Sequence, residues 1–314
     1  MPGVEPSPSD DELLDRFQRA AFGYFLETVN PENGLIADTS RPNWPASIAV
    51  VGFALSCYPA GVERGWMTRE AAIKLTLATL RFFRNSRQGN GDDVTGHKGF
   101  YYHFLDMQTG LRTWRCELSM VDTALLMAGV LVAGAYFCGD NEDEAEIRDV
   151  ADVLYRRVDW RWAQGRRPTL RQGWKPRSGF LHSDWEGYNE ATILYVLAMA
   201  SPDHPVSDDS YAAWTSTYQW ETIYGRDVLY GGGRCSCTSS RMPGSTSPAS
   251  AMRSCAKRTS TISRTAGAQP TSTATMRGKT RLASTAPART CGGFRPVTDP
   301  VIFAPRSRGG RASF

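Results

Sequence analysis

The chain has 314 residues, enough for one large domain or two small ones, with 22% charged and 41% hydrophobic side chains. Its formal net charge of +4 hides two different compositions: residues 1–234 hold 23 basic against 31 acidic side chains, whereas residues 235–314 hold 13 basic side chains and one acid, Asp299. All nine Trp and all twelve Tyr precede residue 231. The last 80 residues therefore lack the large apolar side chains that a packed core needs, and we expect disorder there.

The same inventory argues against a secreted, membrane-spanning or metal-binding protein. The first 17 residues are acidic and polar, unlike a secretory signal. The most apolar run, residues 124–138, is shorter than the ~20 residues of a membrane span. Cys235 and Cys237 are one residue apart rather than the two of a zinc knuckle, and no His follows His204. We expect a cytoplasmic protein with no metal and no other cofactor.

Seven segments show the apolar spacing of helices. Ser9 and Thr68 are suited to cap two of them. Residues 46–58 and 119–138 are apolar almost all round, as in helices buried on more than one side. In chain order the expected helices span residues 11–29, 46–58, 69–85, 119–138, 142–158, 189–200 and 208–222. Between the third and fourth, residues 99–106 and 111–114 predict a hairpin that turns at Thr109-Gly110.

The predicted helices are of two kinds, amphipathic and nearly all-apolar. A double-layered helical barrel produces this pattern because its inner helices are covered on both sides; an array of helical repeats fits as well, although no fixed period is visible. The sequence therefore predicts an all-α fold and, by periodicity alone, no function. We expect three parts: a disordered N-terminus (1–10), a folded body (11–233) and a basic tail (234–314).

Nine segments of the body carry a family resemblance. They are NPENGLIAD (30–38), ASIAVVGFAL (46–55), GVERGWMTREAA (61–72), GHKGFYYHFLD (96–106), RCELSMVDTALL (115–126), VDWRWA (158–163), GWKPRSGF (173–180), DWEGYNEA (184–191) and AAWTSTYQWETIYG (212–225). In this order and at these spacings they resemble the glycoamylase-like domain family, whose relatives include endo-β-1,2-glucanases and the C-terminal region of cyclic β-1,2-glucan synthases. The resemblance implies an (α/α)6 barrel, of which residues 11–233 would be the N-terminal half, with a substrate cleft formed by loops at one end.

Cleavage of a glycosidic bond needs two carboxyl groups, one that protonates the leaving oxygen and one that activates water or attacks. Asp122 lies in an apolar helix, and Glu186 and Glu190 are four residues apart, on one face if that segment is helical. The resemblance marks these three acids as catalytic, without assigning their roles. The plainer alternatives are that Asp122 anchors a buried helix and that the two glutamates lie on a solvated helix end.

Further polar and aromatic side chains near the motif acids are candidates for substrate binding, because aromatic rings stack on sugar faces. Asp38 is also suited to stabilise a turn, His103 to form a structural hydrogen bond and Glu117 to pair with a helix dipole. Trp185 and Tyr188 are also suited to the core. The candidate substrate-binding residues are Asp38, Tyr102, His103, Trp114, Glu117, Trp185 and Tyr188.

The resemblance stops at the triple glycine 231–233, where the family continues with a segment like PLFVHQLSHAWIDF. Reading the last base of each codon from Arg234 with the first two bases of the next permits Leu-Phe-Val-His-Gln-Leu-Ser-His-Ala-Trp-Ile. The Ala is forced, because the codon of Met242 ends in G and that of Pro243 begins with CC. The sequence therefore predicts a shifted reading frame after about residue 233, and an inactive, poorly soluble product.

Three function classes remain open at this stage. The first is a glycoside hydrolase or transglycosylase that acts on a glucan, and the second is a protein that binds carbohydrate without cleaving it. The third, nucleic-acid binding through the basic tail, is disfavoured because the tail has no Tyr or Trp for base stacking. The sequence fixes neither the linkage, nor the stereochemical outcome, nor the oligomeric state.

Overall fold

The computed structural model of the protein describes residues 9–229. The expected disorder of residues 1–8 and the expected tail 234–314 lie outside the described residues. Asp10, expected at the end of a disordered segment, is instead the first residue of a helix. Ser9 caps that helix: its hydroxyl accepts from the amide of Glu12, and the Glu12 carboxylate accepts from the amide of Ser9.

All seven predicted helices are present in the described part, and an eighth, α6, is short. Their order and bounds are α1 Asp10–Glu27, α2 Ile48–Glu63, α3 Arg69–Asn85, α4 Met120–Tyr136, α5 Glu142–Arg157, α6 Trp160–Gln164, α7 Thr192–Ala200 and α8 Asp209–Thr215. None of these helices is long and apolar enough to span a bilayer. The fourth and fifth expected helices shorten by one to three residues, and α3 has the predicted bounds because Thr68 caps it.

Short strands add small sheets that the all-α prediction did not include. They are β1 Ala46–Ser47, β2 Gly96–His97, β3 Phe100–Tyr102, β4 Phe104–Leu105, β5 Leu118–Ser119, β6 Gly173–Lys175, β7 Gly179–Phe180, β8 Trp220–Ile223 and β9 Arg226–Leu229. Antiparallel pairing places five of them in the order β2-β3-β5-β6-β7, and β1 pairs with β4. The predicted hairpin is present as a short antiparallel pairing around Thr109-Gly110: Leu105 is bridged to Arg112, and the amide of Thr113 donates to the carbonyl of Phe104.

The prediction of a helix over 208–222 is wrong in its second half. Helix α8 ends at Thr215, and β8 and β9 form an antiparallel hairpin. Tyr224 and Gly225 turn it with φ values of 52° and 70°, the left-handed values of a two-residue hairpin turn.

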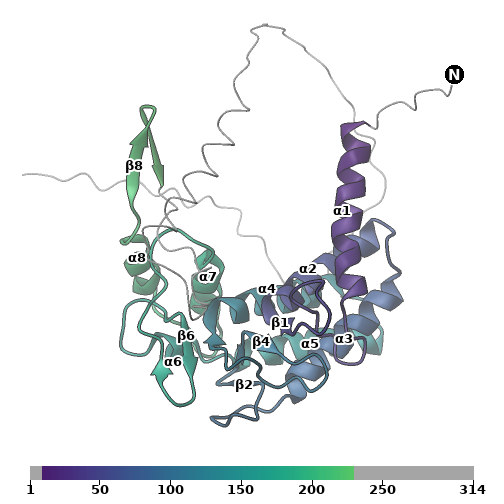
Figure 1. Ribbon diagram of the computed structural model, residues 1–314, viewed down its shortest axis with the longest axis horizontal. Helices are drawn as coiled ribbons and strands as arrows, with labels where there is room; N and C mark the ends of the chain where they lie inside the picture. The colour runs from purple at the N-terminus through teal and green to yellow at the C-terminus, as the bar shows by residue number, and fades with distance from the viewer. Residues whose placement is uncertain (1–8, 230–314) are drawn as a thin grey trace, which may run out of the picture. The chain divides into compact units, whose positions relative to one another are not determined.

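Helices of two kinds pack in two layers, as the alternation predicted. The apolar α2 and α4 contact each other along their length, while the amphipathic α3 and α5 contact each other and cover them (Figure 1). Helix α7 packs on α4, and α1 contacts α2. Closure of these layers into a full (α/α)6 barrel stays a prediction.

Glycines set the close approach of α2 and α4. A Cβ on Gly52 would lie 2.3 Å from the carbonyl oxygen of Leu125, and one on Gly129 would lie 2.1 Å from that of Gly52. Backbone atoms cannot move aside as a flexible side chain would. We therefore expect Gly52→Ala to separate the two helices and to destabilise the protein by several kcal/mol, on the order of other overpacked cores.

Gly23 in α1 is the matched control, because its Cβ would meet only the end of the Glu27 side chain at 3.7 Å. Gly23→Ala should stabilise the protein by roughly 0.5–1 kcal/mol through helix propensity. Denaturant unfolding of both variants measures the difference. Equal stabilities would contradict the close packing of α2 on α4.

Helix α1 leaves much of its apolar face uncovered by the described residues. Leu14 is 56% exposed and Phe17 66% exposed, whereas Phe22 on the same helix is buried against Gly61. Phe17→Ala should change the free energy of unfolding by less than ~0.5 kcal/mol and reduce aggregation. Phe22→Ala should cost ~3 kcal/mol. Light scattering and chemical unfolding test the pair, and a large loss of stability in Phe17→Ala would mean that its ring is covered.

Candidate active site

A polar cluster forms where the strands meet the start of α4. His103 lies between β3 and β4, Glu117 immediately precedes β5, and Asp122 lies in the first turn of α4. The backbone joins these segments: the amide of His103 donates to the carbonyl of Glu117 at 3.0 Å, and the amide of Ile48 donates to the carbonyl of His103 at 3.2 Å. The start of α2 and the start of α4 are thereby held at the same cluster.

The imidazole of His103 bridges the two carboxyl groups. Its Nδ1 lies 3.0 Å from Glu117 Oε1, and its Nε2 lies 3.5 Å from Asp122 Oδ2. The hydroxyl of Ser119, the N-cap of α4, donates to Asp122 Oδ2 at 2.6 Å and accepts from the amide of Asp122. The cluster therefore fixes both the helix start and the orientation of the carboxyl group of Asp122.

The two acids titrate in opposite directions from their ordinary values. Burial raises the pKa of Asp122. This effect outweighs the charge of His103 and the hydrogen bond from Ser119, both of which lower that pKa. Burial acts in the same sense on Glu117, but the hydrogen bond with His103, together with the charges of His103 and Lys175, lowers the pKa of Glu117. Such a divergence lets one carboxyl keep its proton while the other is ionised.

Two further predicted site acids act on this cluster. The charge of Glu190 raises the pKa of Asp122, and that of Asp38 raises the pKa of His103. The charge of Glu186 acts on the pKa of Tyr195, and no described contact ties Glu186 to the cluster. The structure thus joins His103, Glu117 and Asp122 by direct contacts and places Asp38 and Glu190 within electrostatic range of them, and no such interaction with the cluster is described for Glu186.

The geometry expected for Glu186 and Glu190 is wrong. Residues 184–191 are irregular, with Gly187 at φ 73°, and α7 begins only at Thr192. The two glutamates therefore do not share a helix face. Asp184 in the same motif is buried and accepts from Thr169, Arg167 and Arg171, which makes it a structural anchor for the loop.

An aromatic chain leads from the cluster to the surface. His103 stacks on Phe104 with ring centroids 3.9 Å apart, and Phe104 contacts Trp114 at 5.1 Å. Trp114 is 55% exposed and meets Trp44 edge-on at 4.9 Å. Trp114 and Arg115 both adopt left-handed φ values, near 50°, which are unusual for residues other than glycine and cost backbone strain.

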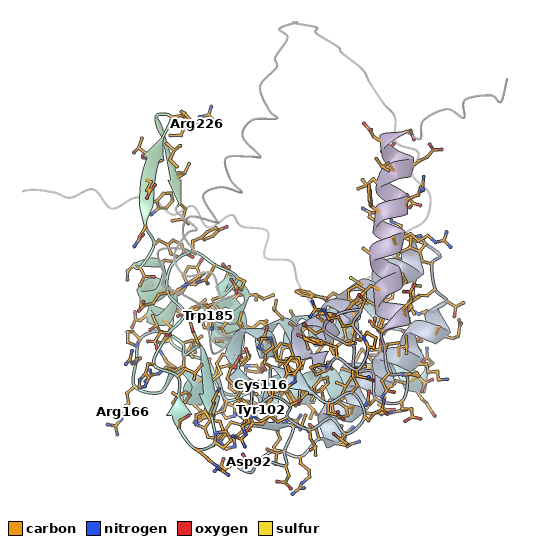
Figure 2. The ribbon with its side chains drawn as sticks, in the orientation of Figure 1. Asp92, Tyr102, Cys116, Arg166, Trp185 and Arg226 are labelled. Carbon is orange, nitrogen blue, oxygen red and sulfur yellow. The ribbon has the colours of Figure 1, made fainter. Side chains whose placement is uncertain are left out.

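Three other predicted binding residues have different surroundings. Tyr102 is fully buried beneath the guanidinium of Arg112, 4.5 Å from its ring, so neither ring face is open to a ligand. Trp185 is buried too, toward α7, whereas Tyr102 and Cys116 lie at the sheet (Figure 2). Tyr188 is half exposed and contacts Tyr218.

Sequence reasoning missed Ser119, Lys175 and Trp44. For Ser119 a local signal existed, since a Ser three residues before an acid at a helix start is a capping pattern. Lys175 and Trp44 join the site through sheet pairing and loop packing, for which the sequence has no local sign.

The described residues contain no group of His, Cys, Asp and Glu side chains that could hold a metal ion. A surface hollow of about 680 Å³ lies between α3 and α5, around Arg69, Lys74 and Glu144, away from the acid cluster. The cluster has two carboxyl groups with pKa values shifted in opposite directions, whereas Glu144 in the hollow is held in an ion pair by Arg69, so the cluster is the better candidate for an active site.

Comparison with known proteins gives the context of this geometry. The Glycoamylase family, described as "Putative glucoamylase", matches residues 182–235. The chain is 29% identical over 233 residues to an exo β-1,2-glucooligosaccharide sophorohydrolase (non-reducing end) of Parabacteroides distasonis, over 70% of this chain and 31% of the relative. The chain thus spans about a third of that relative's length.

Solved structures agree in fold. A "putative glucoamylase" from Bacteroides uniformis superposes with a TM-score of 0.66 at 28% identity, over 73% of this chain and 57% of the other. A β-1,2-glucanase from Parabacteroides distasonis gives a TM-score of 0.60 at 28% identity, over 68% and 31%. An endo-β-1,2-glucanase from Chitinophaga pinensis, at 23% identity, gives 0.63 over 71% and 56%.

Proposed function

Because the chain is glycoamylase-like and related to β-1,2-glucanases, we propose that its body supplies part of a glycoside hydrolase domain that cleaves β-1,2-glucan. The observation that carries the proposal is the cluster of Asp122, Glu117 and His103, in which two carboxyl groups titrate in opposite directions. Glycosidic cleavage requires one protonated and one ionised carboxyl.

Asp122 and Glu190 are the acids that we propose for the chemistry. The raised pKa of Asp122 suits a proton donor, and Glu190 is close enough for its charge to act on Asp122. Glu186 stays a prediction from the family motif alone. Asp38 and Trp114 would contact the sugar, the first at the cluster and the second as an exposed stacking surface.

We further propose that a shifted reading frame replaces the remainder of the domain after about residue 233. The family match ends at residue 235, close to the point where the composition changes from acidic and aromatic to basic and Ser-rich. The exposed apolar side chains of α1 fit a body that lacks neighbouring helices. On this proposal the chain as written is inactive.

The nucleotide sequence of the codons for residues 231–245 tests the shift. One inserted or deleted base should restore the family-like string, and an uninterrupted frame with incompatible codons would refute the proposal. The frame-restored gene should then encode a protein that releases reducing sugar from β-1,2-glucan and not from β-1,3- or β-1,4-glucan. Absence of turnover from every glucan would refute the enzyme assignment.

One observation favours a second candidate, carbohydrate binding without cleavage. The exposed Trp114, supported by Trp44, is suited to stack on a sugar whether or not a bond is cut. Binding of β-1,2-glucan that persists without turnover in the frame-restored protein would select this alternative.

A further inference from the structure

We propose that His103 is a positioning residue which, as an imidazolium, ties Glu117 and Asp122 into one coupled unit. The effect of His103 on turnover rests on the proposed function. The protonation state of its ring and the coupling of the ring to the two acids can be tested in any folded form of the chain.

The contacts of the two ring nitrogens carry the inference. Nδ1 faces a carboxylate oxygen of Glu117 at 3.0 Å, and Nε2 faces one of Asp122 at 3.5 Å. A neutral imidazole has one acceptor nitrogen. At Nδ1 it would face Glu117, whose lowered pKa keeps it ionised and unable to donate; at Nε2 it would face Asp122 Oδ2, which already accepts from Ser119. Only the doubly protonated ring offers an N–H to both acids.

The ring cannot turn away from this arrangement without losing several contacts. It stacks on Phe104 with an interplanar angle of 12°, and the backbone of His103 is hydrogen-bonded on both sides, to Glu117 and to Ile48. Its side chain is 29% exposed, so solvent reaches only part of it. The charge is therefore held in place between the acids.

The titratable groups that act directly on His103 are all acids. Burial by itself would lower its pKa, but the hydrogen bond to Glu117 and the charges of Asp122, Glu117 and Asp38 raise the pKa above its ordinary value. Glu190 adds a further negative charge near Asp122, and Lys175 acts on Glu117 as a cation. Apart from His103 itself, the only cation that acts on these acids in the described interactions is Lys175, and it acts on Glu117.

The unit also distinguishes the two oxygens of Asp122. Its Oδ2 receives the hydroxyl of Ser119 and faces Nε2 of His103. Neither of these two donors contacts Oδ1. The geometry thus points to Oδ1 as the oxygen that would carry the exchangeable proton, with His103 and Ser119 fixing its direction.

Proton NMR of the full chain tests the proposal directly. The sequence has four histidines, so four ring signals are expected, and His103→Gln identifies the relevant one. We expect His103 to titrate above pH ~6.5, and the isosteric variants Glu117→Gln and Asp122→Asn each to lower its pKa by roughly one unit. His97 is an internal reference: burial against its neighbours lowers its pKa.

Asp152→Asn is the matched control, because Asp152 is an exposed acid on α5 that pairs with Arg156. It should leave the His103 signal unchanged. A His103 that titrates at or below pH ~6.5, or that ignores Glu117→Gln, overturns the proposal. In the frame-restored protein His103→Gln should lower kcat and move the alkaline limb of the pH profile, which His103 and Asp122 set together; loss of Tm alone, with an unchanged profile, would mean a structural role only. If that protein is inactive, the titration of the ring still decides the inference.

Discussion

In the frame-restored protein, Asp122→Asn is expected to reduce turnover of β-1,2-linked glucose oligosaccharides by about 10³-fold. Proton transfer by a positioned side chain contributes typically 10²–10⁴-fold, and an amide cannot donate that proton. The side chain keeps its shape, so Ser119 can still contact it and the start of α4 should remain folded. The loss should therefore fall on kcat, with oligosaccharide affinity and Tm nearly unchanged.

Initial rates and calorimetric binding, each with purified oligosaccharide, measure the two effects separately. Asp152→Asn on α5 is again the control, since its carboxylate is exposed and pairs only along its own helix and with no site residue in the described contacts. It should retain full activity. An Asp122→Asn variant with more than about a tenth of the parent rate would remove Asp122 from the chemistry.

The raised pKa of Asp122 and the lowered pKa of Glu117 also predict the shape of the pH profile. Activity should require Asp122 protonated, Glu190 ionised, and Glu117 ionised so that it holds the charged His103 beside Asp122. The acidic limb should therefore report Glu117 together with Glu190, and the alkaline limb the coupled Asp122–His103 pair. Glu117→Gln should change the acidic limb, because only Glu190 is then left to set it. A profile whose acidic limb is the same in Glu117→Gln would assign that limb to another group.

Helices were predictable where the determinants are local. Thr68 caps α3 and Ser9 caps α1 by side-chain hydrogen bonds to amides three residues on, so spacing along the chain is enough to locate both starts. Residues 220–223 continued a helical spacing, yet the left-handed pair Tyr224 and Gly225 turns the chain into a hairpin. Strands of two or three residues have no periodicity of their own and exist through distant partners, as Leu118 does with Trp174.

The candidate active site also has a part that was predictable from local sequence and a part that was not. Asp122 stands out in sequence because it is a charge within an apolar helix, and family motifs add Glu190. That His103 contacts both Glu117 and Asp122 depends on the pairing of β3 with β5, which brings residues 14 and 19 positions apart together. For Glu186 the helical assumption failed because Gly187 interrupts the segment.

A large effect on stability is expected away from the active site, at Glu144. This carboxylate, 3% exposed at the N-terminal turn of α5, accepts from Arg69 Nε at 2.9 Å, Arg69 Nη2 at 2.7 Å and the amide of Gly139 at 2.7 Å. The hydrogen bonds from Arg69, with smaller contributions from Gly139 and Asn141, lower its pKa to about 2. Glu144→Gln leaves Arg69 without its counter-charge, and we expect a loss of about 3 kcal/mol.

The sign of the pH dependence follows from the same shift. The pKa of Glu144 is lower in the folded state than the ordinary value of 4.5 for a glutamate. Its stabilisation is therefore complete above about pH 4.5 and is lost as the pH falls toward about 2. The free energy of unfolding of the parent should decline across that window, and the decline should be smaller in Glu144→Gln. Urea unfolding of both proteins at pH 3 and pH 7 measures it.

Glu146 on the same helix is the matched comparison, because it pairs with Arg81 of α3 at the surface. Its side chain is 33% exposed and that of Arg81 is 50% exposed, so solvent screens the pair and Glu146→Gln should cost at most ~0.5 kcal/mol. Both ion pairs join α3 to α5, and they differ chiefly in burial and in the number of donors to the carboxylate. If Glu144→Gln and Glu146→Gln lose equal stability, burial of Glu144 does not strengthen its pair with Arg69. The contact between α3 and α5 would then rest on their apolar faces alone.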